Sequence, residues 1–189
     1  GDYNTAIGAG ALNSNTNASG NTAIGYATLN ANTTGDGNVA VGYASLFSNT
    51  EGGGNTALGY LASYSNITGD YNTAVGEAAL KNNTASHNTA VGWYALYANT
   101  SGAYNTALGR SLRNNTTGRY NTGIGYLALY NNTTADFNSA YGYAALFSNT
   151  TGDKNVAIGY KAGYENQSGS YNVFIGYEAG YNETGDNKL

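Results

Sequence analysis

The chain has 189 residues, a formal net charge of −4 at pH 7 and only 10% charged residues. Its seven Lys and Arg residues are scattered, which excludes the concentrated basic surface of a nucleic-acid-binding protein. No apolar stretch approaches the roughly 20 residues of a membrane-spanning helix, and the absence of Cys excludes disulfides and thiolate metal sites. Glycine (28 residues) and tyrosine (19 residues) are abundant, as is typical of a short motif copied many times.

From its first residues onward, the chain repeats a motif in which Asn-Thr-Ala-Ile-Gly is followed by Ala-Leu, Asn-Thr and a Gly-rich turn. The closing glycine of this string recurs at Gly8, Gly25, Gly42, Gly59, Gly76, Gly92, Gly109, Gly125, Gly142, Gly159 and Gly176. The spacing between these anchor glycines is constant, except that two of the steps are shorter by a single position. Residues 1–189 therefore form a single repeat array. We expect the chain to be a fragment of a longer protein, because its first residues already lie within a repeat.

Units of this length are too short to fold singly, so each must bury its apolar side against its neighbours. Helical solenoid repeats are about twice as long, and Asn-Gly, the best marker of tight hairpins, never occurs. The sequence predicts an all-β protein, a parallel β-solenoid of eleven coils of about 17 residues, roughly 50 Å long. Each coil is expected to hold one strand in the Thr-Ala-Ile segment. A second extended segment, or a short helical turn, is expected at Ala-Leu.

Side chains alternate between the two faces of a strand, so each face has its own composition. One face carries Thr, the aliphatic residue before the anchor glycine and the Tyr after it, and the other carries Asn, Ala and Gly. We expect the coil to be filled by these aliphatic residues, namely Ile7, Ile24, Val41, Leu58, Val75, Val91, Leu108, Ile124, Tyr141, Ile158 and Ile175. Leucines of the Ala-Leu segment should join them, namely Leu12, Leu29, Leu46, Leu80, Leu96, Leu129 and Leu146. The Asn-Ala-Gly face is then expected to point outward and to form a close seam with another copy, which favours a homo-oligomer.

Residue types that carry chemistry are sparse. The single histidine, His87, occupies a slot held by Tyr or Phe in other repeats, and it is interpreted as an aromatic substitute because no second His accompanies it. Acidic residues recur in Gly-Asp turns but are missing from many repeats, which favours turn chemistry over a calcium-binding β-roll. No nucleophile or phosphate-binding motif is present. We therefore expect no catalysis, no cofactor and no metal site.

Aromatic residues directly after the anchor glycine are candidates for binding. They should form a ladder along the rod, either by simple stacking or as a strip that binds carbohydrate or protein. This candidate ladder comprises Tyr26, Tyr43, Tyr60, Trp93, Tyr126, Tyr143, Tyr160 and Tyr177. A regular Thr in each strand makes an ice-binding surface a further interpretation. The Ile and Tyr residues that flank this Thr disfavour it.

Asparagines of the Asn-Thr segment have two alternative roles. Stacked in register, their amides can bond from rung to rung. Many of them also complete an Asn-x-Ser/Thr motif and are candidates for glycan attachment. These candidates are Asn32, Asn66, Asn99, Asn115, Asn132, Asn149, Asn166 and Asn182.

Several strings carry a resemblance to known repeats. Asn-Val-Ala-Val-Gly-Tyr at residues 38–43, Asn-Val-Ala-Ile-Gly-Tyr at 155–160 and the closing Ala-Gly-Tyr-Asn-Glu-Thr-Gly-Asp-Asn-Lys-Leu at 179–189 resemble repeats of YadA-like trimeric autotransporter adhesin heads and of tail fibre-type proteins. The resemblance covers the whole chain, although the units are longer than is typical of those heads. It implies a left-handed parallel β-roll, three chains side by side, exposed on a cell surface or a virion tail fibre.

These features favour an extracellular, non-catalytic structural or adhesive fibre segment that mediates surface attachment. Its expected partners are further copies of the chain, in a homotrimer, and a host-surface glycan or protein, with no nucleic acid and no membrane insertion. The alternative is a subunit of a self-assembling extracellular filament, with or without a coat of glycans. A closed trimer would favour the first, and open-ended growth the second.

Overall fold

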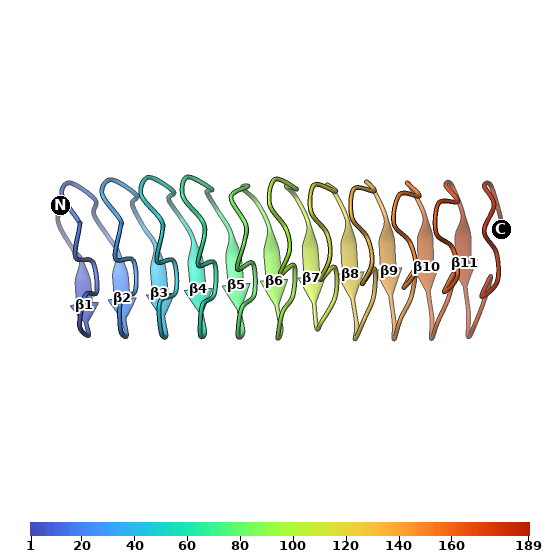
Figure 1. The fold of residues 1–189 in the computed structure, drawn as a ribbon, viewed down its shortest axis with the longest axis horizontal. Coiled ribbons are helices and arrows are strands. Elements are labelled where there is room, and N and C mark those ends of the chain that lie inside the picture. Colours follow the sequence, from blue (N-terminus) through green and yellow to red (C-terminus); the bar gives the residue numbers. More distant parts are fainter.

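The computed structural model describes all 189 residues as one long rod of stacked coils (Figure 1). Each coil contributes one three-residue strand, and no helix forms. The strands are β1 (Thr5–Ile7), β2 (Thr22–Ile24), β3 (Val39–Val41), β4 (Thr56–Leu58), β5 (Thr73–Val75), β6 (Thr89–Val91), β7 (Thr106–Leu108), β8 (Thr122–Ile124), β9 (Ser139–Tyr141), β10 (Val156–Ile158) and β11 (Val173–Ile175). They form one sheet whose strand order follows the sequence. The predicted parallel β-solenoid is confirmed. The fold offers no helix that could cross a membrane.

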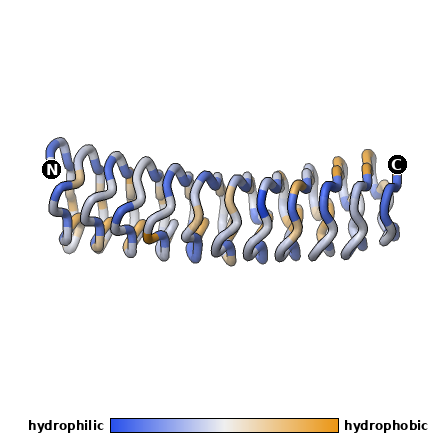
Figure 2. Tube along the Cα trace, turned by 90° about the horizontal axis from the view of Figure 1, so that it is seen from above, coloured by the Kyte–Doolittle hydropathy of each residue, from blue (hydrophilic) through white to orange (hydrophobic).

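Neighbouring strands are parallel and in register, so equivalent residues of successive repeats stack along the rod. Thr5 lies opposite Thr22 in the first pair of strands. The register survives a shortened repeat, because Ala74 still lies opposite Ala90. Hydrophobic and hydrophilic stretches therefore recur from coil to coil along the rod (Figure 2).

The anchor glycine is required where each strand ends. Gly25 has a φ of 131°, and a Cβ built on it would lie only 2.0 Å from the carbonyl oxygen of Gly42 in the next coil. Only glycine permits this backbone conformation together with so close an approach. The recurrence of glycine at this position is thus explained by the backbone.

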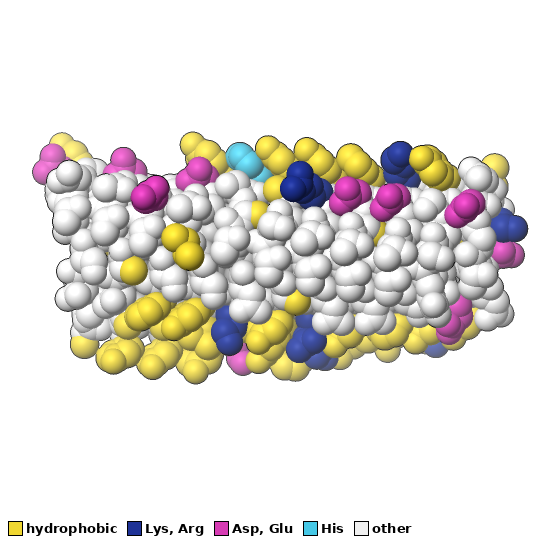
Figure 3. Space-filling model, turned by 45° about the horizontal axis from the view of Figure 1, so that its top comes forward, with side chains coloured by type: hydrophobic (Ala, Val, Ile, Leu, Met, Phe, Trp, Pro, Cys, Tyr) yellow, Lys and Arg dark blue, Asp and Glu magenta, His cyan; other side chains and the backbone are white.

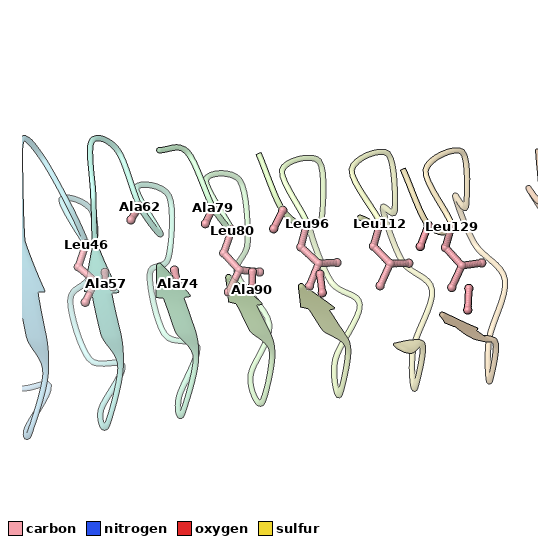
Figure 4. Close-up of a cluster of buried hydrophobic side chains, with 14 of the residues drawn as sticks. Leu46, Ala57, Ala62, Ala74, Ala79, Leu80, Ala90, Leu96, Leu112 and Leu129 are labelled. Carbon is pink, nitrogen blue, oxygen red and sulfur yellow. The ribbon is translucent and has the colours of Figure 1, made fainter. Parts of the chain in front are cut away.

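The core is narrow and consists almost entirely of alanine and leucine (Figure 4). The central residue of each strand points inward, as Ala57 and Ala74 do, and both are fully buried. Leucines of the Ala-Leu segment, such as Leu46 and Leu80, meet these alanines from the opposite wall (Figure 4). The predicted leucine column is therefore confirmed.

The predicted orientation of the strand is wrong. The aliphatic residue before each anchor glycine points outward, so that Ile24 is 36% exposed and Ile158 is 41% exposed. The Asn-Ala-Gly face points into the coil and cannot form the expected seam with another chain. Size explains the reversal, because a coil with a single short strand holds about one large aliphatic side chain. Leucine takes that place, and the strand must therefore present alanine.

The Ala-Leu segment forms a turn, so the predictions of a second strand or a helical turn are both wrong. Alternate residues adopt positive φ, with values of 53° at Ala27 and 47° at Leu29. This left-handed conformation costs about 1–2 kcal/mol per residue but lets the chain reverse while the leucine points inward. The turn still bonds to the next coil, since the Leu29 N–H donates to the carbonyl oxygen of Ser45 at 3.1 Å.

Two strands depart from the central alanine, and each departure is compensated nearby. Gly123 makes room for Ser111, whose hydroxyl donates to the Gly123 carbonyl oxygen at 2.7 Å. A Cβ at position 123 would lie 3.1 Å from the Ser111 Cβ. Phe174 fills the space left by Gly163 and Gly180, which stand where other coils have leucine, because a Cβ on either glycine would overlap the phenyl ring.

Candidate functional site

Two columns of asparagine line the inner corners of the coil, and both are buried. In the first column, Asn49 Nδ2 donates to Asn32 Oδ1 at 2.8 Å and to the Gly52 carbonyl oxygen at 2.9 Å. In the second column, the Asn38 backbone N–H donates to Asn21 Oδ1 at 2.8 Å, while Asn38 Nδ2 donates to the same Gly52 oxygen. The predicted bonding of asparagine amides from rung to rung is confirmed.

Most of the candidate glycan sites belong to the first column and are incompatible with a glycan in the folded coil. Fully buried are Asn32, Asn66, Asn99, Asn115, Asn132, Asn149 and Asn166. An N-linked sugar is attached at Nδ2, which in this column donates hydrogen bonds inside the coil, as Asn99 Nδ2 does to Asn83 Oδ1 at 2.6 Å. These seven predictions are therefore wrong. Asn182, in the last coil, is exposed.

The candidate aromatic ladder lies along one edge of the rod and is solvent-exposed. It consists of two runs of stacked rings, Tyr26–Tyr43–Tyr60 and Tyr126–Tyr143–Tyr160–Tyr177. Ring centroids are 5.1 Å and 5.3 Å apart in the first run. Trp93 stands between the runs with the Arg110 guanidinium 4.5 Å from its ring. The predicted ladder thus forms, with an interruption at Glu77 and Arg110.

A second aromatic ladder, missed by the sequence reasoning, runs beside the first. Its rings stand five residues after the anchor glycine in most coils, namely Phe47, Tyr64, Tyr97, Tyr130, Phe147, Tyr164 and Tyr181. Stacking distances are 5.2 Å between Phe47 and Tyr64 and 5.0 Å between Tyr164 and Tyr181. The fixed offset from the anchor glycine was the signal that could have revealed it.

A groove of about 710 Å³ lies between the two ladders over the N-terminal coils. Its walls are Tyr26 and Tyr43 from the first ladder and Phe47 and Tyr64 from the second. Its floor and ends are formed by smaller residues and one cation, namely Ala9, Gly10, Ala27, Asn30, Ala44, Leu61 and Lys81. Figure 3 shows hydrophobic side chains gathered thickly at this part of the lower edge.

The opposite edge carries a third row of rings and a row of aspartates (Figure 3). His87 stacks between Tyr71 and Tyr104, with centroid distances of 5.4 Å and 4.9 Å, so its predicted role as an aromatic substitute is confirmed. The aspartates close turns of the preceding coil, since Asp70 Oδ1 accepts the Gly53 N–H at 2.8 Å. No group of three or more His, Cys, Asp or Glu side chains could hold a metal ion.

Two lysines interact with tyrosine hydroxyls. Lys154 Nζ donates to the Tyr171 hydroxyl at 2.9 Å, and this hydrogen bond raises the pKa of Lys154 above its ordinary value. Partial loss of hydration lowers the pKa of Lys161, but charge interactions with Tyr160 and Tyr181 outweigh it and the net change is upward. Both ammonium groups are therefore charged at neutral pH.

The outward side of the eleven strands, here called the sheet face, carries no charged residue. One rank holds Thr, Ser or Val and the other holds Ile, Val, Leu or Tyr. No family model, no curated protein and no solved structure matches the chain.

Proposed function

We propose that the chain is a rigid, non-catalytic segment of an extracellular fibre that assembles side by side with two further copies of itself and serves surface attachment. The observation that carries the proposal is the sheet face, an uncharged strip in which eleven strands are in register. Its aliphatic rank is partly exposed, for example at Ile24, Val91 and Ile175. This rank makes a narrow apolar strip beside the Thr-rich rank, and an apolar strip on a protein surface normally marks a site of association.

Rigidity follows from hydrogen bonds that run along the rod on both sides of each coil. On the strand side, the Thr22 N–H donates to the Asn38 carbonyl oxygen at 2.8 Å. On the turn side, the Ser48 N–H donates to the Tyr64 carbonyl oxygen at 3.1 Å. Bending the rod would strain both sets of bonds, so the rod resists bending as an extended fibre must.

The size of the sheet face suits association of many coils at once. Eleven three-residue strands, each about 4.8 Å from the next, present roughly 500 Å². Two such faces together cover about 1,000 Å², near the lower limit for a specific protein interface. In a trimer each sheet face is instead shared between the two neighbouring copies, and the three faces together cover about 1,500 Å², which favours the trimer expected from the resemblance.

The proposal is tested by the molar mass of the chain in solution, measured by light scattering. The expected mass is three times the 19.5 kDa of one chain. Replacing Val91, on the sheet face, by Lys should place three ammonium groups in one interface and reduce the mass to that of a monomer. The matched control is Ser101→Lys, since Ser101 is exposed in a turn outside the strands and the trimer should persist.

Other outcomes would redirect the proposal. A monomeric wild-type chain would contradict association through the sheet face. Growth into particles of many sizes would favour the open-ended filament, in which strand edges pair end to end. Dissociation of the Ser101→Lys control would place the interface elsewhere on the rod.

A further inference from the structure

The groove between the two aromatic ladders has the dimensions of a binding site for an elongated molecule. Its lining extends from Ala9 in the first coil to Lys81 in the fifth, which corresponds to about 19 Å along the rod. Its volume of about 710 Å³ lies within the range of small-molecule sites. A chain-like ligand lying parallel to the rod axis fits this shape better than a compact one.

The chemistry of the walls favours a ligand rich in hydroxyl groups. Within each ladder the rings turn their faces to one another, as in the stacked pair Tyr26 and Tyr43. The groove therefore presents ring edges and hydroxyls more than open ring faces. Unlike the hydroxyl of Tyr171, which accepts from Lys154, those of Tyr26, Tyr43 and Tyr64 have no partner within the chain. They are free to bond to a ligand.

The spacing of the rings along the groove walls is similar to that of a sugar chain. Successive rings of the walls are 5.1 Å and 5.2 Å apart, because one ring belongs to each coil. An extended, β-linked chain of pyranose sugars advances by a similar length, about 5 Å per sugar, which is close to the strand spacing of a sheet. Such a chain can repeat the same contacts in coil after coil.

The charged side chains beside the groove indicate whether a neutral or an anionic sugar chain is preferred. Four of the seven Lys and Arg residues lie on this edge beside aromatic rings, with the cation 4.5 Å to 5.6 Å from a ring centre, namely Lys81, Arg110, Arg113 and Lys161. Only Lys81 lines the groove itself, at one end. No acidic side chain lines the groove, although Glu77 precedes Lys81 in the same coil. The groove therefore offers an anionic group one cationic contact, at Lys81.

We propose that the groove binds a linear, β-linked polysaccharide whose sugars carry carboxylates, with about one sugar per coil and a carboxylate at Lys81. Tyr26, Tyr43 and Tyr64 bond to hydroxyls of the sugars. This assignment deepens the proposed attachment role and rests on it, since it names the class of surface to which the fibre attaches.

Calorimetric titration of the whole chain tests the assignment, with a β-linked mannuronate hexamer as the anionic probe and cellohexaose as the neutral one. The mannuronate should bind more tightly. Lys81→Gln should weaken mannuronate binding about fivefold and leave cellohexaose unchanged. Lys154→Gln, on the opposite edge, is the matched control and should change neither. Ala44→Leu should weaken both probes more than tenfold by filling the floor, and it should fold because Leu61 already occupies the equivalent position of the next coil.

Several results would overturn the assignment. These are no binding of either probe, equal binding of both with no effect of Lys81→Gln, or binding that survives Ala44→Leu. Binding of the planar dye thioflavin T without either sugar would show that the groove takes aromatic molecules instead. Light scattering on the same samples separates the two proposals. A monomer that still binds mannuronate contradicts only the association, and a trimer that binds neither sugar contradicts only the groove.

Discussion

Phe174 occupies space that belongs to leucine in other coils, and it does so for two coils at once. Gly163 and Gly180 stand at the leucine positions on either side of its ring. Phe174→Ala should leave a cavity that neither glycine can fill. We expect the free energy of unfolding to fall by about 3 kcal/mol, measured by urea denaturation.

The compensation can be tested in reverse. Gly163→Leu alone should also destabilise, because a Cβ at this position would lie 2.5 Å from the ring of Phe174. In the Phe174→Ala background the same leucine should recover a large part of the lost stability. Losses that simply add in the double variant would show that the two positions do not share one space.

Ser63 interrupts the leucine column between Leu46 and Leu80. It is 1% exposed, and its hydroxyl has no hydrogen-bond partner. Its φ of 50° is nearly that of the two leucines, 49° and 51°, so leucine fits the backbone there. Ser63→Leu should raise the free energy of unfolding by about 1–2 kcal/mol by filling space and removing an unpaired polar group.

The measurement for Ser63 is again urea denaturation, with Ser65→Leu as the control in the same coil. Ser65 is partly exposed, and a change there should stay within about 0.5 kcal/mol. A destabilised Ser63→Leu variant would mean that the surrounding alanines have already closed over the gap.

The asparagine column acts as a single element rather than as a set of independent contacts. Asn99 Nδ2 donates to Asn83 Oδ1 at 2.6 Å and to the Gly102 carbonyl oxygen at 2.7 Å, while its Oδ1 accepts from Asn115 at 2.8 Å. Asn99→Ala should leave buried polar groups unpaired on both neighbouring coils. We expect a loss of about 2–3 kcal/mol in thermal or urea unfolding.

The control for the column is Asn182→Ala, which removes an exposed asparagine of the last coil and should have little effect. If the two variants lost stability equally, the column would be incidental to the fold. The same column explains why a sugar on Asn99 and folding of its coil exclude each other.

Features that depend only on spacing could be predicted from the sequence. The period gave the parallel stacking, the leucine column and the first aromatic ladder, because identical residues must stack when strands are in register. The rule that larger apolar residues are buried gave the wrong answer for which face of the strand points into the coil. Tyr141 replaces Ile, Val or Leu in one repeat, and a narrow core could not hold so large a side chain. This substitution was a sign that the aliphatic rank is exposed.

The turn conformations depend on tertiary structure and could not be predicted locally. Leucine disfavours positive φ in isolation, yet Leu46, Leu80 and their equivalents adopt it in every regular coil. Burial of the leucine side chain and hydrogen bonds to the next coil outweigh the local preference. The groove was missed for a related reason, since it exists only when two ladders lie side by side.

At the scale of the whole molecule, the rod is a one-dimensional stack in which each coil contacts only the coils beside it. Its stability should therefore be close to a sum over coils and their interfaces. The aromatic and cationic groups of one edge, the aspartates of the other and the uncharged sheet face all extend along this stack. Each surface lengthens or shortens with the number of coils.

Removal of one complete coil tests this description. Residues 138–154 make up such a coil, and their deletion joins Phe137 to Asn155, which occupies the same position in the repeat as Asn138. β8 would then pair with β10, with alanine, leucine and asparagine columns still in register. The product should be a ten-stranded rod that is about 4.8 Å shorter by small-angle scattering. The slope of its unfolding free energy against urea concentration should fall by about one tenth, because less surface is exposed on unfolding.

Deletion of residues 138–145 alone is the decisive comparison. It removes β9 and the anchor glycine Gly142 but leaves Leu146, so the following turn can no longer reach its place in the stack. This shorter deletion should cost more stability than the longer one and should broaden the unfolding transition. The opposite order would mean that the coils are not equivalent and that the segment from β9 to β10 has a role that its neighbours cannot take over.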